Sequence, residues 1–241
     1  MNNNWLDQYP EAAAFFGPFL DHQDLEDILV SRFPAGSPIM EESSYDDSAL
    51  YYILEGVAEG MCSSLADIEN GLYYVPSKVG QGSFTGFFEA TQGKPTKRRL
   101  SIYAKTDVTA LKISQSLVYR WAHFKPDLLL NIFSRILVGS WKQREVVSNV
   151  NSFNSNIKLA VHLCYLYDMY LHSCYPPEYS GSVRIMDTHR ELGYAVGCSI
   201  RTVDRCIARF CEEGSLSLRR GKIHMNQSQY ELLLHYAETH S

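Results

Sequence analysis

The most constraining feature of the chain is a pair of helical patterns, residues 188–197 and 200–212, separated by one tight turn. Gly197 can adopt the positive φ that ends a helix and redirects the backbone. Ser199 then supplies a side-chain cap for the second helix. Two helices joined by so short a connection form a helix-turn-helix.

The second of these helices carries two arginines on its outward face. Arg201 and Arg205 are four residues apart, or about one helical turn. An arginine at such a position can donate to the two acceptors that guanine presents in the major groove. Thr202 and the helix N-terminus are suited to phosphate contacts. This pattern predicts a DNA-recognition helix.

A basic hairpin follows the two helices. Residues 216–218 and 223–225 have the composition of short strands, and the turn between them is Arg219-Arg220-Gly221-Lys222. Such a hairpin is a wing that lies along the DNA backbone. The helix pair and the basic hairpin together favour DNA binding over a purely structural module. The candidate DNA-binding residues are Thr188, His189, Ser199, Arg201, Thr202, Arg205, Arg219, Arg220 and Lys222.

The first half of the chain has a different pattern. Short aromatic and β-branched runs, several of them alternating with period two, are separated by glycine or proline. They predict strands of a sandwich or barrel. One helical segment, residues 24–30, precedes them. The predicted strands lie within residues 51–60, 71–75, 80–84, 100–104 and 108–113.

Helices begin at Ser114 and again at Pro126. In the second helix, seven positions recur at alternating spacings of 3 and 4 residues, which is a heptad seam. A long helix between two domain-like segments favours a dimer coiled coil, although the pattern also fits packing in the monomer's own core. The predicted seam consists of Leu129, Ile132, Ile136, Gly139, Gln143, Val146 and Val150.

A polar cluster at residues 151–156 separates this helix from a strongly apolar helix at residues 157–171. The expected fold class is α+β. The expected domains are residues 1–114, an effector-sensing β-roll; residues 115–151, a helical connector and dimerisation helix; and residues 152–241, a winged helix-turn-helix.

Several motifs resemble those of the cyclic-AMP receptor protein and fumarate–nitrate regulator (CRP/FNR) superfamily. They are Glu191-Leu192-Gly193, Val196-Gly197-Cys198-Ser199, Thr202-Val203-Asp204-Arg205, Lys125-Pro126-Asp127-Leu128-Leu129, Gly82-Ser83-Phe84-Thr85-Gly86 and Ala104-Lys105-Thr106. The resemblance implies a homodimeric transcription regulator that binds a palindromic operator on double-stranded DNA. It also implies contact with RNA polymerase if the chain is an activator.

The resemblance further implies an effector in the β-roll, and here the sequence departs from the family. Members that bind cyclic nucleotide carry a Gly-Glu-Leu-Gly run, whereas this chain has Gly86-Phe87-Phe88-Glu89. Phenylalanine cannot accept the hydrogen bond of a ribose hydroxyl. Cyclic AMP is therefore not the expected effector, and an apolar, aromatic or anionic ligand, or an empty collapsed pocket, is expected instead. The candidate effector-binding residues are Phe84, Phe87, Phe88, Arg98, Arg99, Gln143 and Arg144.

The recognition helix departs from the family as well. Many members carry Glu at the position of Arg201, where the carboxylate accepts from cytosine. An arginine favours guanine or phosphate, so we expect a half-site that differs from TGTGA at that base. Arg205 matches the guanine-reading arginine of the family.

Composition excludes other classes of function. No cysteine precedes Cys62, so the chain lacks the closely spaced N-terminal ligands of an iron–sulfur cluster. The eight histidines show no pattern that selects a haem ligand. No nucleophile–base pair, metal-binding cluster or glycine-rich phosphate loop is evident, so the chain is not expected to be an enzyme and no metal or certain cofactor is expected.

The N-terminus does not have the layout of a signal peptide, and no apolar run is long enough to span a membrane. A cytoplasmic protein with free cysteines is therefore expected. Residues 1–110 carry 7 Lys and Arg against 16 Asp and Glu, whereas residues 181–241 carry 8 against 7. The first half would repel nucleic acid more strongly than the second. Two alternatives remain: a regulator controlled by redox state, a partner or no effector, and a sensor or scaffold with vestigial DNA binding.

Overall fold

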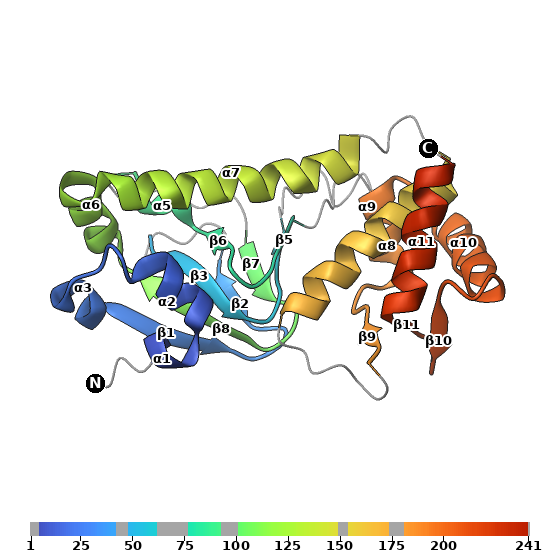
Figure 1. Ribbon diagram of the computed structural model, residues 1–241, viewed down its shortest axis with the longest axis horizontal. Coiled ribbons are helices and arrows are strands. Elements are labelled where there is room, and N and C mark those ends of the chain that lie inside the picture. Colours follow the sequence, from blue (N-terminus) through green and yellow to red (C-terminus); the bar gives the residue numbers. More distant parts are fainter. Residues whose placement is uncertain are drawn as a thin grey trace. The chain divides into compact units, whose positions relative to one another are not determined.

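The computed structural model describes residues 5–41, 48–61, 77–92, 101–148, 154–173 and 181–240. These residues form two compact units. The first includes the described residues up to Ser140, and the second those from Trp141 onward. The expected boundary at residue 151 lies outside the described residues, and the three-part division remains a prediction. The expected α+β class is confirmed: helices and antiparallel sheets occur in both units (Figure 1).

The first unit contains two four-stranded antiparallel sheets. The strand order of one is β1-β8-β3-β6, and that of the other is β2-β7-β4-β5. The strands are β1 (Ile28–Phe33), β2 (Pro38–Met40), β3 (Leu50–Glu55), β4 (Ala58–Met61), β5 (Ser77–Val79), β6 (Phe84–Thr85), β7 (Ser101–Ala104) and β8 (Val108–Ile113). The predicted strands at 100–104 and 108–113 are confirmed, and the stretch at 51–60 forms two strands, β3 and β4. The prediction at 80–84 is wrong except at Phe84, because most of these residues form the turn before β6, and the strand at 71–75 lies outside the described residues.

Strand β3 is buried on both faces, and it separates two apolar clusters. Tyr51 and Ile53 pack in a cluster that draws residues from both sheets. Tyr52 and Leu54 point to the opposite face and join a second cluster with residues of the helices. Because successive side chains of a strand alternate between faces, β3 contributes to both cores.

Helices cover the outer face of the first sheet. Trp5 and Phe16 from the N-terminal helices, and Trp121 and Ile132 from later ones, are buried in the same cluster. Figure 1 shows α7 extending lengthwise beside these strands. The helices of this unit are α1 (Trp5–Gln8), α2 (Pro10–Phe16), α3 (His22–Asp27), α5 (Phe87–Ala90), α6 (Gln115–Phe124) and α7 (Pro126–Ser148), which continues past Ser140.

The expected helix at residues 24–30 is wrong in its second half. Helix α3 ends at Asp27, and Ile28 begins strand β1, which pairs with β8. Two of the three residues in Ile28-Leu29-Val30 are β-branched, which favours the strand. Pairing with an adjacent strand then overrides the weak helical pattern.

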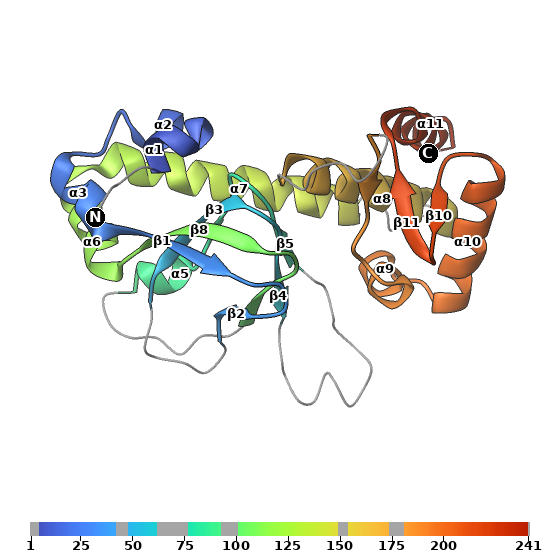
Figure 2. The same cartoon turned by 90° about the horizontal axis from the view of Figure 1, so that it is seen from below.

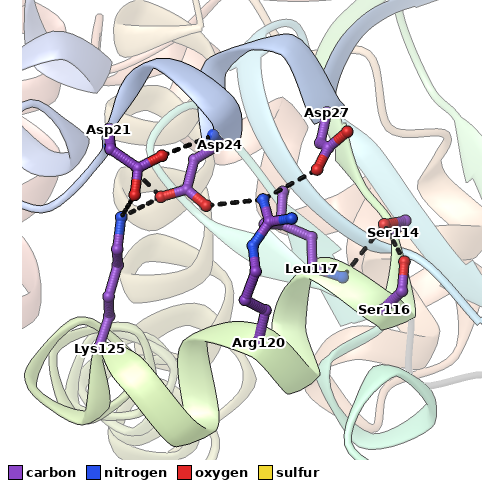
Figure 3. A network of polar contacts seen from close by, with 8 residues as sticks. All are labelled: Asp21, Asp24, Asp27, Ser114, Ser116, Leu117, Arg120 and Lys125. Atoms are coloured by element: carbon purple, nitrogen blue, oxygen red, sulfur yellow. Dashed lines mark hydrogen bonds and ion pairs between the residues drawn. The ribbon is translucent and has the colours of Figure 1, made fainter.

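An ion-pair network links α3 and its N-cap residue Asp21 to α6 and to Lys125, the residue that precedes α7 (Figure 3). The Asp24 carboxylate, fully buried, accepts hydrogen bonds from Arg120, at 2.9 Å, and from Lys125. Asp27 accepts from the same Arg120 nitrogen at 2.8 Å, and Asp21 from Lys125 at 2.8 Å. Five charged side chains therefore fix the start of the β-roll against the helices that follow it.

The second unit consists of helices around a small antiparallel sheet of order β10-β11-β9 (Figure 2). Helix α8 packs against α9, α10 and α11. The elements are α8 (Ser155–His172), β9 (Val183–Arg184), α9 (His189–Val196), α10 (Ile200–Glu212), β10 (Ser217–Arg219), β11 (Lys222–Met225) and α11 (Gln227–Thr239). The sequence pattern predicted helices α8, α9 and α10 and the two strands of the hairpin, and α11 adds a helix after the hairpin.

None of the helices in the described part of the chain is both long enough and apolar enough to cross a membrane. Within the same residues, His, Cys, Asp and Glu side chains form no group of three or more that could hold a metal ion.

Candidate nucleic-acid interface

Helix α9 begins with a reciprocal cap. The Thr188 hydroxyl accepts from the backbone N–H of Glu191 at 3.2 Å, and the Glu191 carboxylate accepts from the backbone N–H of Thr188 at 2.6 Å. This capping box satisfies two backbone donors at the helix start. The cap therefore defines the residue at which α9 begins.

The turn between α9 and α10 depends on two glycines. Gly197 has φ +68°, in the left-handed region, and closes α9. A Cβ atom on Gly193 would lie 2.7 Å from the backbone oxygen of Cys198. The Cys198 N–H donates to the Gly193 carbonyl at 2.8 Å. The backbone of the turn is therefore in direct contact with α9.

Helix α10 begins at the expected residue. The Ser199 hydroxyl accepts from the backbone N–H of Thr202 at 3.2 Å, and the two hydroxyls are 2.9 Å apart. One face of the helix is buried and apolar, which holds the opposite face outward. The buried residues are Val203, Cys206, Ile207 and Phe210.

The outward face carries the predicted recognition residues. Arg201 and Arg205 are exposed, and Thr202 is half-buried beside the cap. Neither arginine forms an ion pair with a carboxylate in the described residues, whereas Arg209, further along α10, pairs with Glu213 at 2.7 Å. The first two turns of α10 therefore present cationic donors to a ligand.

The predicted hairpin is present with a two-residue turn. Arg219 pairs with Lys222, and the turn residues Arg220 and Gly221 both have positive φ, +51° and +72°. Two positive φ values match the type I′ turn that suits the twist of a hairpin. Arg219, Arg220 and Lys222 are all exposed, so the tip of the hairpin is basic.

His189, predicted as a DNA contact, lies against the recognition helix. Its Nδ1 is 2.6 Å from Asp204 Oδ1, and the pair joins the start of α9 to α10. The sequence analysis did not assign Asp204 a role, because two residues 15 positions apart gave no local signal. The pair orients both helices at their exposed ends.

The four cysteines that the structure describes in this unit, Cys164, Cys198, Cys206 and Cys211, are free and buried or half-buried. Cys206 is buried and donates to Asn156 Oδ1 at 3.0 Å, and burial raises the pKa of the Cys206 thiol. Burial likewise raises the pKa of Cys164 to about 12. Thiols with raised pKa values are poor nucleophiles. Both side chains pack as small buried groups.

The predicted effector-binding residues do not gather at one described site. Phe84 is buried against the rings of Phe16 and Tyr52, and Phe87 packs at the margin of that core, 6.1 Å from the Phe133 ring. Phe88 is 57% exposed in this structure, and its assignment to the effector site stays a prediction. Arg98 and Arg99 lie outside the described residues, as do the side chains of Gln143 and Arg144.

The predicted dimer seam needs a correction on α7. Ile132 is fully buried in the core of its own unit, and Leu129 and Ile136 pack against the same core. These three residues therefore face the β-roll. Gly139 is exposed, Val150 lies outside the described residues, and so do the side chains of Gln143 and Val146. Among the described side chains of α7, the large apolar ones that are exposed are Leu130, Phe133, Leu137 and Val138.

A helix-turn-helix followed by a basic hairpin, with exposed arginines on the second helix, defines the winged class of DNA-binding domain. Together with the double-sheet unit that precedes it, this architecture is that of a DNA-binding transcription regulator. Comparisons with known proteins show which regulators the chain is similar to.

No protein-family model matches the chain. The cAMP-activated global transcriptional regulator CRP of Salmonella typhimurium is 26% identical over 196 residues, which is 80% of this chain and 87% of that protein. A CRP/FNR-family regulator of Thermus thermophilus has the same fold, with a TM-score of 0.67 and 21% identity, over 88% of this chain and all of that one. The c-di-GMP responsive global regulator CLP of Xanthomonas campestris has a TM-score of 0.60 and 16% identity, over 89% and 99% of the two chains.

The chain is similar in sequence to CRP, at 26% identity, and it has the fold of the CRP/FNR superfamily of transcription regulators. The resemblance inferred from its motifs is therefore confirmed. Because members of this family are regulators and not enzymes, the expectation that the chain is not an enzyme is confirmed as well.

Proposed function

We propose that the chain is a homodimeric, sequence-specific regulator that binds a two-fold symmetric operator. The observation that carries the proposal is the exposed face of α10, where Arg201 and Arg205 stand free of carboxylate partners in the described residues. The basic hairpin lies in the same unit. Base contacts from a helix and backbone contacts from a wing are the two components of specific recognition.

Each basic group has a distinct task in this proposal. Arg205 reads a guanine through its O6 and N7 acceptors. Arg201 reads a second guanine or a phosphate, so the half-site differs from TGTGA at that base. Arg219, Arg220 and Lys222 neutralise phosphates and add a contribution to affinity that does not depend on sequence. The N-terminus of α10 is suited to a further phosphate contact.

The proposed dimer forms through α7. This helix has 23 residues and is therefore about 35 Å long. Leu130, Phe133 and Leu137 follow one another at spacings of 3 and 4, and all are exposed in the single chain. An apolar stripe with this spacing fits a coiled-coil partner of the same sequence. A two-fold dimer would place two recognition helices about one turn of DNA apart.

We further propose that an effector other than cyclic AMP controls the first unit. The Salmonella relative is cAMP-activated and the Xanthomonas relative is responsive to c-di-GMP, so these two relatives differ in effector. In this chain Phe87 replaces the ribose-binding carboxylate, and its ring packs near Phe133 of α7. Because the Phe87 ring contacts α7, a conformational change in the β-roll could shift the proposed dimer helix through this contact. RNA polymerase is the expected further partner if the chain activates transcription.

The test is a selection of random duplex DNA with the purified full chain, followed by binding titrations at two salt concentrations. The proposal predicts a palindromic site with half-sites about one helical turn apart. It also predicts a steep loss of affinity with salt, because phosphate neutralisation releases counterions. Recovery of TGTGA half-sites, unaffected by Arg201→Ala, would contradict the assignment of Arg201. A thermal-shift titration should show no stabilisation by cyclic AMP.

A further inference from the structure

Helix α10 exposes one large aliphatic side chain. Ile200, its first residue, is 44% exposed. The inward positions of the helix, Val203, Ile207 and Phe210 among them, are nearly inaccessible to solvent. The remaining exposed residues of α10 are charged or, at position 208, alanine. Ile200 thus differs from the other large aliphatic residues of the helix, Val203 and Ile207, which are buried in the core.

The position of Ile200 gives it access to a ligand. It lies directly between Ser199, whose side chain caps the helix, and the exposed Arg201. In helix-turn-helix domains the N-terminal residues of the second helix approach the base edges in the major groove. A side chain at the first helical position therefore lies close to the bases when Arg201 and Arg205 contact DNA.

The chemistry of the major groove limits which group of a base can contact Ile200. Among the four bases, only thymine presents an apolar group there, its 5-methyl group, and the other exposed features are hydrogen-bond donors and acceptors. An isoleucine cannot satisfy a donor or acceptor. It can instead exclude water from a methyl group, and its β-branched side chain loses little rotational freedom on contact.

We propose that Ile200 is a specificity-determining residue that contacts the 5-methyl group of one thymine in each half-site. This inference rests on the proposed function, because it requires α10 to enter the major groove. It adds an apolar contact to the guanine contacts assigned to the arginines. The half-site should accordingly contain a thymine near the guanine read by Arg205.

The test replaces that methyl group on the DNA. A site is first selected with the full chain, and each thymine of the half-site is then replaced in turn by deoxyuridine, which lacks only the methyl group. At one thymine position per half-site, the wild-type chain should lose affinity about fourfold, which corresponds to one buried methyl group. At the same position Ile200→Ala should bind thymine and uracil equally.

Two controls separate this contact from a general loss of structure. Leu232 on α11 is 52% exposed, so Leu232→Ala removes a comparable aliphatic surface and should leave the preference for thymine unchanged. Ile200→Val, which retains part of the side chain, should keep an intermediate preference. Alanine is a favourable residue in a helix, so Ile200→Ala should leave the unfolding temperature nearly unchanged.

Either of two results would overturn the inference. One is a wild-type chain that binds every uracil-substituted site as well as the parent site. The other is an Ile200→Ala chain that still prefers thymine as strongly as the wild type. Both leave the selected palindrome and the proposed function intact, whereas failure to select any site would contradict the proposed function itself.

Discussion

At the scale of single residues, the turn of the helix-turn-helix is the most sterically restricted point of the second unit. A side chain on Gly193 would place its Cβ atom 2.7 Å from the Cys198 oxygen, and a backbone atom cannot move aside cheaply. Gly193→Ala should therefore destabilise the chain by about 2 kcal/mol, in the range typical of overpacking. Thermal or urea unfolding measures this change in the free energy of unfolding.

A matched glycine gives the opposite expectation. A Cβ atom on Gly139, at an exposed position of α7, would have no neighbour within 4 Å. Gly139→Ala should leave stability unchanged or raise it by about 0.5–1 kcal/mol, because alanine loses less backbone entropy. If both alanine variants unfolded at the same denaturant concentration as the wild type, the close contact at Gly193 would not restrict this position to glycine.

The basic residues of α10 and of the hairpin should differ in what they contribute to binding. Arg205→Ala should cost about 1–3 kcal/mol on the selected site and relax specificity at one base pair. Lys222→Ala at the hairpin should weaken specific and random DNA alike and reduce the salt slope by about 1. Titrations of both variants on specific and random duplexes measure the difference. Equal losses on the two duplexes for Arg205→Ala would reassign Arg205 as a phosphate contact.

At the scale of elements, the carboxylate of α3 makes the first unit sensitive to acid. Burial alone would raise the pKa of Asp24, but the hydrogen bonds from Lys125 and Arg120 outweigh burial and hold this pKa below its usual value. Because the pKa of Asp24 is lower in the folded chain than in the unfolded chain, the carboxylate stabilises the folded state at pH values above its unfolded pKa, near ~4. This stabilisation is lost as the pH falls through the pKa of the folded chain. Unfolding followed from about pH 7 down to about pH 2 should show the loss below about pH 4.

Two substitutions in this network test its burial. Asp24→Asn removes the charge that pairs with Arg120 and Lys125, so we expect a loss of about 3 kcal/mol near pH ~7 and a flatter acid profile. Asp27 contacts the same arginine, but its side chain is 46% exposed. Asp27→Asn should therefore cost less than about 1 kcal/mol. Equal effects of the two substitutions would show that burial of Asp24 does not matter.

The elements differed in how well the sequence could predict them, and the reason is the range of the interactions. The helix-turn-helix is encoded locally: Thr188 caps one helix, Gly197 ends it and Ser199 caps the next. All three signals lie within a few residues of the structure they determine. Strand β8 was likewise predicted to the residue from its alternating pattern.

Longer-range interactions gave no such signal. Arg120 and Asp24 are 96 positions apart, and nothing near either residue indicates the other. The prediction that Leu129, Ile132 and Ile136 form a dimer seam on α7 failed for a related reason. The helix has apolar residues on two faces. Ile132 faces its own core and Leu137 faces outward. Periodicity detects an apolar stripe but does not show which stripe the chain itself covers.

At the scale of the whole molecule, the outward stripe of α7 tests the dimer proposal. Leu137 is 50% exposed and makes no contribution to the buried core, so Leu137→Glu should leave the fold of one chain intact. In a dimer seam the same carboxylate would have to be buried without a partner, which is strongly unfavourable. Analytical ultracentrifugation should find a monomer for this variant and a dimer for the wild type.

Loss of the dimer should also change DNA binding in a specific way. A dimer gains affinity because the second half-site is bound at high effective concentration, so a monomer loses affinity for the full palindrome far more than for a single half-site. Leu232→Glu introduces the same charge at an exposed position of α11. This control variant should remain dimeric and bind the palindrome with wild-type affinity. A Leu137→Glu chain that stays dimeric and binds the palindrome normally would place the two-fold contact elsewhere. In that case the exposed stripe of α7 would need another partner, and the path from the β-roll to the recognition helices could not pass through this seam.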